Sequence, residues 1–157
     1  MIWSSGLLLS LISSYIYLKK NKLDILKYLD VFAIAVPLGH AIARIGCYLI
    51  GDHIGKLTNV PWAISLNGST HPVVLYEIIL LLSIFLVLYN LKDKNLEKGS
   101  LFAIYLLSYS LGRFVIDFFR TDPLYYGLTI AQYFCIIMFL TMIIFVSLRK
   151  LRKYKKI

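Results

Sequence analysis

The sequence predicts an all-α membrane protein that forms a single transmembrane domain over residues 1–157. Three observations support this fold class. Hydrophobic residues make up 59% of the chain, charged residues only 16% against about 25% in an average soluble domain, and the mean hydropathy is +0.75. The strand-length alternation that a transmembrane barrel requires does not recur along the chain, so we expect helices to cross the membrane.

Five apolar stretches are long enough to cross a hydrocarbon core of about 30 Å. We expect transmembrane helices at approximately residues 2–18, 28–50, 73–90, 101–119 and 129–148. The first stretch lacks the basic n-region and the small-residue cleavage site of a signal peptide. We therefore expect it to be a retained helix.

The distribution of basic residues predicts the orientation. Of 17 lysines and arginines, 13 fall in segments 19–27, 92–98 and 149–157, which five spans place on one side. The positive-inside rule then places the N-terminus outside, the C-terminus in the cytoplasm, and connections 51–72 and 120–128 outside. Attraction of the basic cytoplasmic tail, 149–157, to anionic lipid headgroups accounts for the net charge of +9 without nucleic acid.

Charged residues inside the predicted spans indicate a functional site. An arginine within a membrane helix costs at least about 2.5 kcal/mol and normally faces the protein interior or a watery cavity. Arg44 and Arg113 each lie six residues before the outer end of a span, which is about 9 Å deep. Glu77 and Asp117 fall in the same layer, so three helices are expected to converge there.

The chemistry of this layer suits a phosphate group. Guanidinium groups are planar, bidentate donors, and a phosphate at this depth belongs to a phospholipid headgroup. One alternative is that Arg113 pairs with Asp117, or Glu77 with Arg44, only to hold the helices together. A small transporter is a further alternative, but the charges share one layer and no inverted repeat is visible.

In the second span, Pro37 removes a backbone donor and Gly39 is expected to let another backbone approach closely, a combination that predicts a kinked or opened helix. Residues 62–66 alternate in polarity before the turn signal Asn67-Gly68, which predicts a short β-arm on the membrane surface in the outer loop after this span. Cys47 and Cys135 are far apart in sequence and are expected to be small core residues, not metal ligands.

Four residues are candidates for a base. His40 shares a helical face with Arg44, and Asp52, His53 and His71 lie in connection 51–72. A histidine that only fills the core, or one that is solvated in a loop, is the alternative in each case.

Three segments of the sequence resemble motifs of one protein family. Residues 37–46, PLGHAIARIG, followed by Gly51-Asp52, are similar to a stretch in which R-I-G leads to N-G-E. Residues 71–77, HPVVLYE, resemble H-P-x-Q-L-Y-E, and residues 109–120, YSLGRFVIDFFR, resemble Y-x-x-x-R-x-x-x-E-x-x-R. In the order and spacing of these motifs, nearly the whole chain resembles the bacterial prolipoprotein diacylglyceryl transferases.

This resemblance implies an enzyme of the bacterial cytoplasmic (inner) membrane. The implied reaction, at the outer leaflet, transfers the diacylglyceryl group of phosphatidylglycerol to the lipobox cysteine in the signal peptide of a preprolipoprotein, and it releases glycerol 1-phosphate. Neither a cofactor nor a metal is expected. The partners are therefore membrane lipids and the prolipoprotein, not nucleic acid.

The resemblance also implies roles for individual residues. Arg44 and Arg113 would stabilise the leaving phosphate, and Glu77 and Asp117 would orient them. The implied catalytic residues are Arg44, Arg113, Asp52, His40, His71 and Glu77. The implied substrate-binding residues are Arg44, Gly46, Tyr76, Tyr109, Asp117 and Arg120.

The sequence departs from the family pattern at several positions. Cys47 and Ile50 replace asparagines, Asp52 and Asp117 replace glutamates, and Val74 replaces glutamine. An early family histidine would fall near Ser4-Ser5-Gly6, where the sequence has none. These departures favour the alternative of a non-catalytic, phospholipid-binding or accessory membrane protein on the same scaffold.

Overall fold

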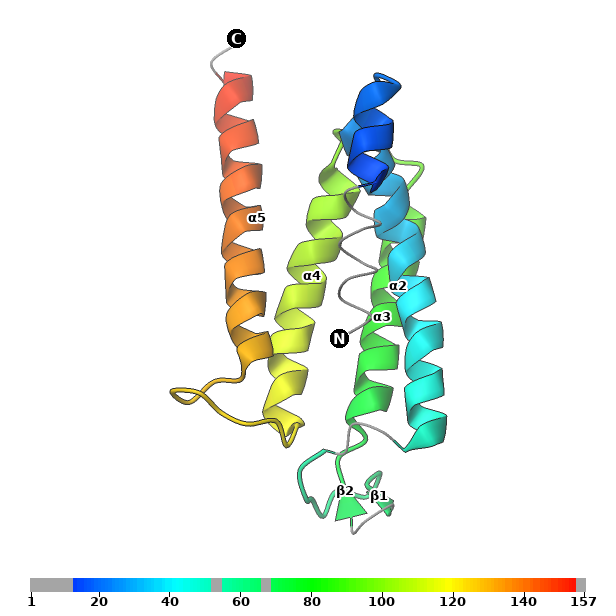
Figure 1. Cartoon of the computed structure of the whole chain (residues 1–157), viewed down its shortest axis with the longest axis vertical. Helices are drawn as coiled ribbons and strands as arrows, with labels where there is room; N and C mark the ends of the chain where they lie inside the picture. The colour runs from blue at the N-terminus through cyan, green and yellow to red at the C-terminus, as the bar shows by residue number, and fades with distance from the viewer. Residues whose placement is uncertain (1–12, 52–54, 66–68, 155–157) are drawn as a thin grey trace.

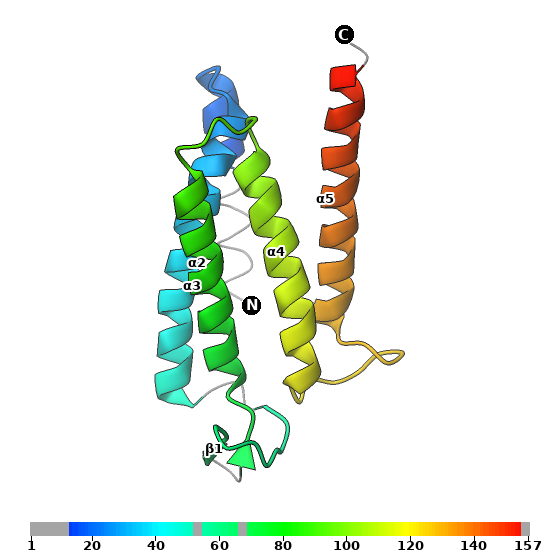
Figure 2. The ribbon, with the colours of Figure 1, turned by 180° about the vertical axis from the view of Figure 1, so that it is seen from behind.

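The computed structural model describes residues 13–51, 55–65 and 69–154. Its elements are α2 (Ile25–Ile50), β1 (Ile64–Ser65), β2 (Ser69–Thr70), α3 (Val73–Leu91), α4 (Ser100–Ile116), η1 (Asp117–Phe119) and α5 (Ile130–Tyr154). Residues 13–20 are also helical. The four long helices run alternately up and down, and α5 packs mainly against α4 (Figures 1 and 2).

Four helices in the described part of the chain have the length and apolar composition needed to cross a membrane. They correspond to four of the five expected spans. Most of the expected first span, 2–18, lies outside the described residues. Residues 149–154, which belong to the expected basic tail, continue α5 as helix.

The core lies between α2, α3 and α4. Its central cluster comprises Ala33, Ile84, Leu88, Leu101 and Tyr105. These residues come from three helices that neighbour one another in the bundle (Figure 1). Packing of small against large apolar side chains therefore aligns the three helices that carry the charged residues.

The same helical faces carry charged residues to the interior. On α3, the buried positions Glu77, Leu81, Ile84 and Leu88 recur every three or four residues, which is one face of a helix. On α2, the residues buried in the described chain are Ala33, Pro37 and Ala41, which are four apart. Arg44 follows Ala41 by three residues and extends this face into the bundle.

Pro37 does not interrupt α2. The helix continues from Ile25 to Ile50, and Pro37 is fully buried. A β-carbon added to Gly39 would meet no described atom within 4 Å, so no other backbone approaches this glycine closely. The expectation that Gly39 permits such an approach is therefore wrong.

At one end of the bundle, Asp30 of α2 caps the first turn of α4. Its carboxylate accepts hydrogen bonds from the backbone N–H of Gly99 at 2.6 Å and of Phe102 at 3.0 Å. The first N–H groups of a helix have no partner within the helix, and an anion is favoured there. This contact ties α2 to α4 at the end where the basic segments meet.

Two further contacts join the basic segments at that end. The Lys98 ammonium lies 2.5 Å from Asp24 Oδ2, and Arg149 donates to the carbonyl oxygen of Lys98. The hydrogen bond from Lys98 lowers the pKa of Asp24. The pair is therefore formed at neutral pH and is lost as the pH falls through this lowered pKa.

The opposite end of the bundle carries the connection between α2 and α3. In this connection β1 and β2 pair antiparallel, with Ile64 opposite Thr70 and Ser65 opposite Ser69. Each strand has two residues, and the expected Asn67-Gly68 turn lies outside the described chain. That this hairpin rests on a membrane surface stays a prediction.

Candidate active site

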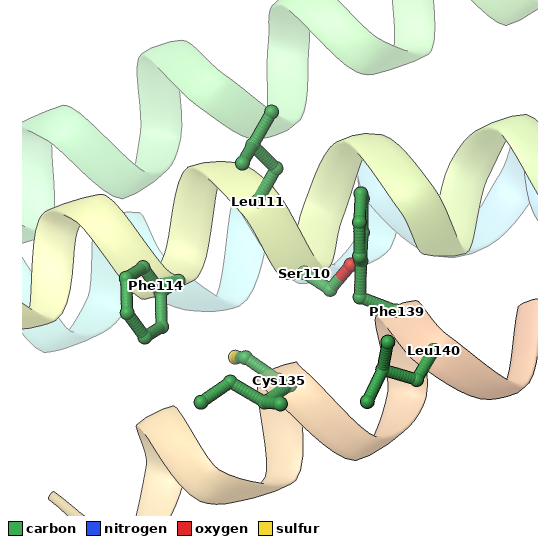
Figure 3. Close-up of a pocket in the computed structure, with 7 residues that line it drawn as sticks. Ser110, Leu111, Phe114, Cys135, Phe139 and Leu140 are labelled. Atoms are coloured by element: carbon green, nitrogen blue, oxygen red, sulfur yellow. The ribbon is translucent and has the colours of Figure 1, made fainter. Parts of the chain in front are cut away.

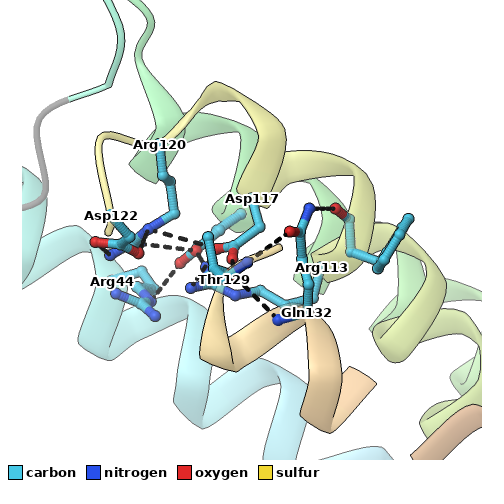
Figure 4. A network of polar contacts seen from close by, with 9 residues as sticks. Arg44, Arg113, Asp117, Arg120, Asp122, Thr129 and Gln132 are labelled. Atoms are coloured by element: carbon cyan, nitrogen blue, oxygen red, sulfur yellow. Dashed lines mark hydrogen bonds and ion pairs between the residues drawn. The ribbon is translucent and has the colours of Figure 1, made fainter. Parts of the chain in front are cut away.

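Five charged side chains meet at the end of the bundle that lies away from the basic segments (Figure 4). We call this group the charged cluster: Arg44 from α2, Glu77 from α3, Arg113 from α4, Asp117 from η1 and Arg120 directly after η1. The expected convergence of three helices on one polar layer is therefore present in the structure.

Glu77 is the centre of the charged cluster. Its Oε2 lies 2.6 Å from Arg44 Nε, and its Oε1 contacts Arg113 Nη1 and lies 3.5 Å from Arg120 Nη1. Only 3% of this residue is exposed. A carboxylate so deeply buried stays ionised only when cations offset the loss of water, and three guanidinium groups do so here.

Asp117 is the second anion of the cluster. Its Oδ1 lies 3.1 Å from Arg113 Nη2 and 3.5 Å from Arg120 Nε, and its Oδ2 accepts a hydrogen bond from the Thr129 hydroxyl. Arg113 therefore bridges the two buried carboxylates through different nitrogens. Asp122 lies at the exposed rim of the cluster, with 38% of its side chain exposed, and its Oδ2 is 2.7 Å from Arg120 Nε.

The start of α5 is tied to Asp117 by a capping box. The Thr129 hydroxyl oxygen accepts a hydrogen bond from the backbone N–H of Gln132 at 3.1 Å. In return, the Gln132 side-chain oxygen accepts one from the Thr129 N–H at 2.9 Å. The Thr129 hydroxyl proton is donated to Asp117. The residue that caps α5 therefore also positions Asp117, which directly follows α4.

The cluster retains unused capacity for an anion. Three guanidinium groups surround two buried carboxylates, and Asp122 offsets the remaining charge only from the exposed rim. The shortest contact between Arg44 and Glu77 is made by Nε, and within the described part of the chain the two terminal nitrogens of Arg44 make no hydrogen bond. Their N–H groups can therefore donate hydrogen bonds to two oxygens of a phosphate side by side.

The connection after α2 is fastened to the cluster by backbone hydrogen bonds. The Lys56 N–H donates to the Phe119 carbonyl at 2.8 Å, and the His71 N–H donates to the Lys56 carbonyl at 3.0 Å. Gly55 also forms a bridge with Arg120. The segment at residues 55–56 thus lies between the end of η1 and the start of α3.

Gly55 is needed for this close approach. An added β-carbon would overlap the His71 carbonyl oxygen and lie 2.6 Å from Val73 Cγ2. We expect Gly55→Ala to release the segment and to speed amide hydrogen exchange at Lys56 and His71 about 10- to 100-fold, as overpacking of about 1–3 kcal/mol implies. Gly39→Ala, at an open position, is the control. Equal exchange in both variants would contradict this role.

The predicted histidines lie at different sides of the cluster. The His40 ring is 5.9 Å from the Tyr109 ring, which in turn stacks on Tyr105. His71 Nδ1 is 3.2 Å from the Tyr76 hydroxyl, and its ring is 4.9 Å from that of Phe119. Both are partly buried, whereas a solvated loop histidine would not be packed among rings.

Other predicted site residues are not brought into the cluster. Gly46 lies exposed on α2, and an added β-carbon would meet no described atom within 4 Å. Asp52 and His53 lie outside the described residues. Cys47 and Cys135 are free thiols in α2 and α5, and Cys135 is buried as expected for a core residue.

Sequence reasoning missed three polar residues at the site. Thr129 and Gln132 are almost fully buried, and Asp122 holds Arg120. The spacing of Thr129 and Gln132 matches a capping box, and glutamine is unusual within an apolar span, so a signal was present for both. No sequence signal pointed to Asp122, because acidic residues are common in exposed connections.

An apolar pocket of about 160 Å³ lies between α4 and α5 (Figure 3). Its lining includes Ser110, Phe114, Cys135 and Phe139. Ser110 precedes Arg113 by three residues on the same helix, so the pocket lies about one turn from the charged cluster, toward the basic end.

Comparison with known proteins identifies the family. The profile described as prolipoprotein diacylglyceryl transferase matches residues 1–148. The phosphatidylglycerol-prolipoprotein diacylglyceryl transferase of Campylobacter lari is 39% identical over 137 residues, which cover 83% of this chain and 51% of that protein. That of Finegoldia magna is 39% identical over 124 residues, covering 78% and 50%.

A third relative, from Campylobacter jejuni, has the same name and is 33% identical over 155 residues, covering 94% of this chain and 56% of its own. The chain spans about half the length of the curated relatives it matches. The matched family profile nevertheless extends over all the described helices except the end of α5. This chain therefore belongs to the prolipoprotein diacylglyceryl transferase family.

Proposed function

We propose that this protein transfers the diacylglyceryl group of phosphatidylglycerol to the lipobox cysteine of preprolipoproteins. The names of its relatives support this reaction. The observation that carries the proposal is the position of Arg44: it lies beside Glu77 in a cluster of three guanidinium groups and two buried carboxylates, and its two terminal nitrogens make no hydrogen bond within the described residues.

The bond changes of this reaction suit such a cluster. The cysteine sulfur forms a thioether bond to the glyceryl carbon that bears the phosphate, and the bond between that carbon and the phosphate oxygen breaks. Glycerol 1-phosphate leaves with the bonding electrons, and the thiol proton passes to a base. Negative charge therefore grows on the phosphate, where fixed guanidinium donors stabilise it most.

The residues divide into two kinds. Arg44 and Arg113 bind and stabilise the phosphate, whereas Glu77 and Asp117 hold the guanidinium groups in place. Tyr76, Tyr109, Arg120 and Gly46 remain proposed contacts to the lipid or the peptide. His40, His71 and Asp52 remain the proposed groups around the thiol.

We further propose that one acyl chain enters the pocket between α4 and α5. A phosphate at Arg113 would direct the tails along the helices toward the bundle centre, past Ser110. The aliphatic and aromatic lining offers such a chain no charged group.

We propose that the protein is a multi-pass protein of the bacterial cytoplasmic membrane, with the basic end in the cytoplasm and the charged cluster in the outer leaflet. The meeting of Lys98, Asp24 and Arg149 at one end supports a single basic face that attracts anionic headgroups.

Cysteine labelling tests this orientation. With Cys47 and Cys135 replaced by serine, a cysteine at Asn59 is expected to react with an impermeant maleimide on intact cells. A cysteine at Asn95 is expected to react only after lysis. The reverse pattern would contradict the orientation.

The reaction itself is tested with purified protein, phosphatidylglycerol vesicles and a lipobox peptide. We expect release of glycerol phosphate together with a peptide whose mass has risen by one diacylglyceryl group. The Campylobacter lari relative, assayed in parallel, establishes that the conditions permit turnover. Binding of phosphatidylglycerol without release would refute transfer and favour the non-catalytic alternative.

A further inference from the structure

Beside the charged cluster, three ring side chains form a hydrogen-bonded chain. The indole Nε1–H of Trp62 donates to the Tyr76 hydroxyl at 2.8 Å. The same hydroxyl lies 3.2 Å from His71 Nδ1. Because 61% of Trp62 is exposed, this hydrogen bond contributes more than burial to the orientation of the indole ring.

A count of donors and acceptors favours one direction of the chain. An indole nitrogen can only donate, so the Tyr76 oxygen accepts from Trp62. The phenolic proton remains, and within the described ranges His71 Nδ1 is the one other polar group at hydrogen-bond distance from that hydroxyl. A Tyr76 hydroxyl that uses this proton donates it to Nδ1, and a neutral His71 then carries its own proton on Nε2.

We propose that Trp62 and Tyr76 are positioning residues that hold His71 in the Nε2–H tautomer, so that His71 donates a hydrogen bond to the phosphate instead of accepting the thiol proton. The inference rests on the proposed function and refines it. It leaves His40 and Asp52 as the remaining candidates for the base.

The packing around His71 supports a fixed ring. Phe119 lies 4.9 Å from the imidazole and 6.1 Å from the Tyr76 ring, in an edge-on arrangement with the latter. The His71 backbone is held by the Lys56 carbonyl. Because Arg120 directly follows Phe119, the imidazole lies next to the chain segment that supplies the third guanidinium group.

The tautomer can be measured directly by ¹⁵N nuclear magnetic resonance. The chain has three histidines, so protein labelled with ¹⁵N-histidine in lipid nanodiscs gives few signals, and His71→Asn assigns the one of interest. At a pH where the ring is neutral, we expect an unprotonated Nδ1 and a protonated Nε2. A protonated Nδ1 in the wild type would overturn the proposal.

Two variants test the roles of the ring partners. Tyr76→Phe removes both hydrogen bonds and is expected to give a mixture of tautomers. Trp62→Phe keeps an aromatic ring but removes the donor, and a smaller shift in the same direction is expected. Tyr126→Phe, at a fully exposed tyrosine, is the matched control. A His71 spectrum unchanged by Tyr76→Phe would also overturn the proposal.

In the transfer assay, Trp62→Phe is expected to lower kcat/KM for phosphatidylglycerol about fivefold, as the loss of one hydrogen bond implies. An unchanged kcat/KM would refute the donor role of His71. The tautomer measurement needs no turnover. Failure of the proposed reaction is therefore distinguishable from failure of this inference.

Discussion

Glu77→Gln is expected to abolish transfer and to destabilise the protein more than any other conservative change at the site. The glutamine keeps the shape of the side chain but leaves three guanidinium groups without their shared anion. Removing one partner from a buried charge pair costs about 3–5 kcal/mol, because the other charge stays buried and uncompensated. Here one change removes the partner of three charges.

Thermal unfolding in detergent measures the stability effect, and glycerol phosphate release measures transfer. Asp93→Asn is a matched control, because it also neutralises one acid but lies exposed in the connection between α3 and α4. The control is expected to unfold as the wild type does. If Glu77→Gln does so too, the carboxylate does not hold the cluster together.

Much of this site follows from the sequence for a physical reason. Lipid excludes charges that have no partner, so Arg44 and Arg113 had to face the protein interior and find carboxylates. Their equal distance from the ends of their helices placed them in one layer, and Glu77 at the start of α3 completed it. Helix spacing and depth were sufficient for this part of the prediction.

The remaining features depend on contacts that periodicity does not encode. Nothing in the sequence indicates that Gly55 packs against the His71 backbone, because a glycine in a loop has many uses. Gly39 was misread for the same reason: a glycine in a helix permits a close approach but does not require one. The arrangement of residues around a glycine decides its role.

The sequence also did not indicate which carboxylates each of the three arginines contacts. Arg120 lies beyond the helical part of α4, where the backbone becomes extended, and it contacts Glu77, Asp117 and Asp122. Helical spacing can relate Arg113 to Asp117, which are four apart, but it does not extend past the end of a helix. A turn of backbone at η1 thus brings in a third cation.

Arg113→Lys is expected to lower the transfer rate by a factor on the order of 10² or more while retaining the positive charge. Arg113 contacts Glu77 through Nη1 and Asp117 through Nη2, so one planar group holds two carboxylates and is itself held by them. A lysine has one nitrogen and cannot bridge both in this geometry. The charge would remain, but its position relative to the phosphate would not.

Arg44→Lys provides an informative comparison, because Arg44 contacts one carboxylate and offers its terminal nitrogens to the ligand. We expect Arg44→Lys to raise KM for phosphatidylglycerol with little change in the unfolding temperature. Arg113→Lys, in contrast, is expected to lower both kcat and the unfolding temperature. Arg149→Lys is the control, since a lysine can also donate to the Lys98 carbonyl and lie over the Phe145 ring, the two contacts that Arg149 makes in the described chain. Full activity of Arg113→Lys would mean that charge alone, without a fixed bridge, is sufficient for this site.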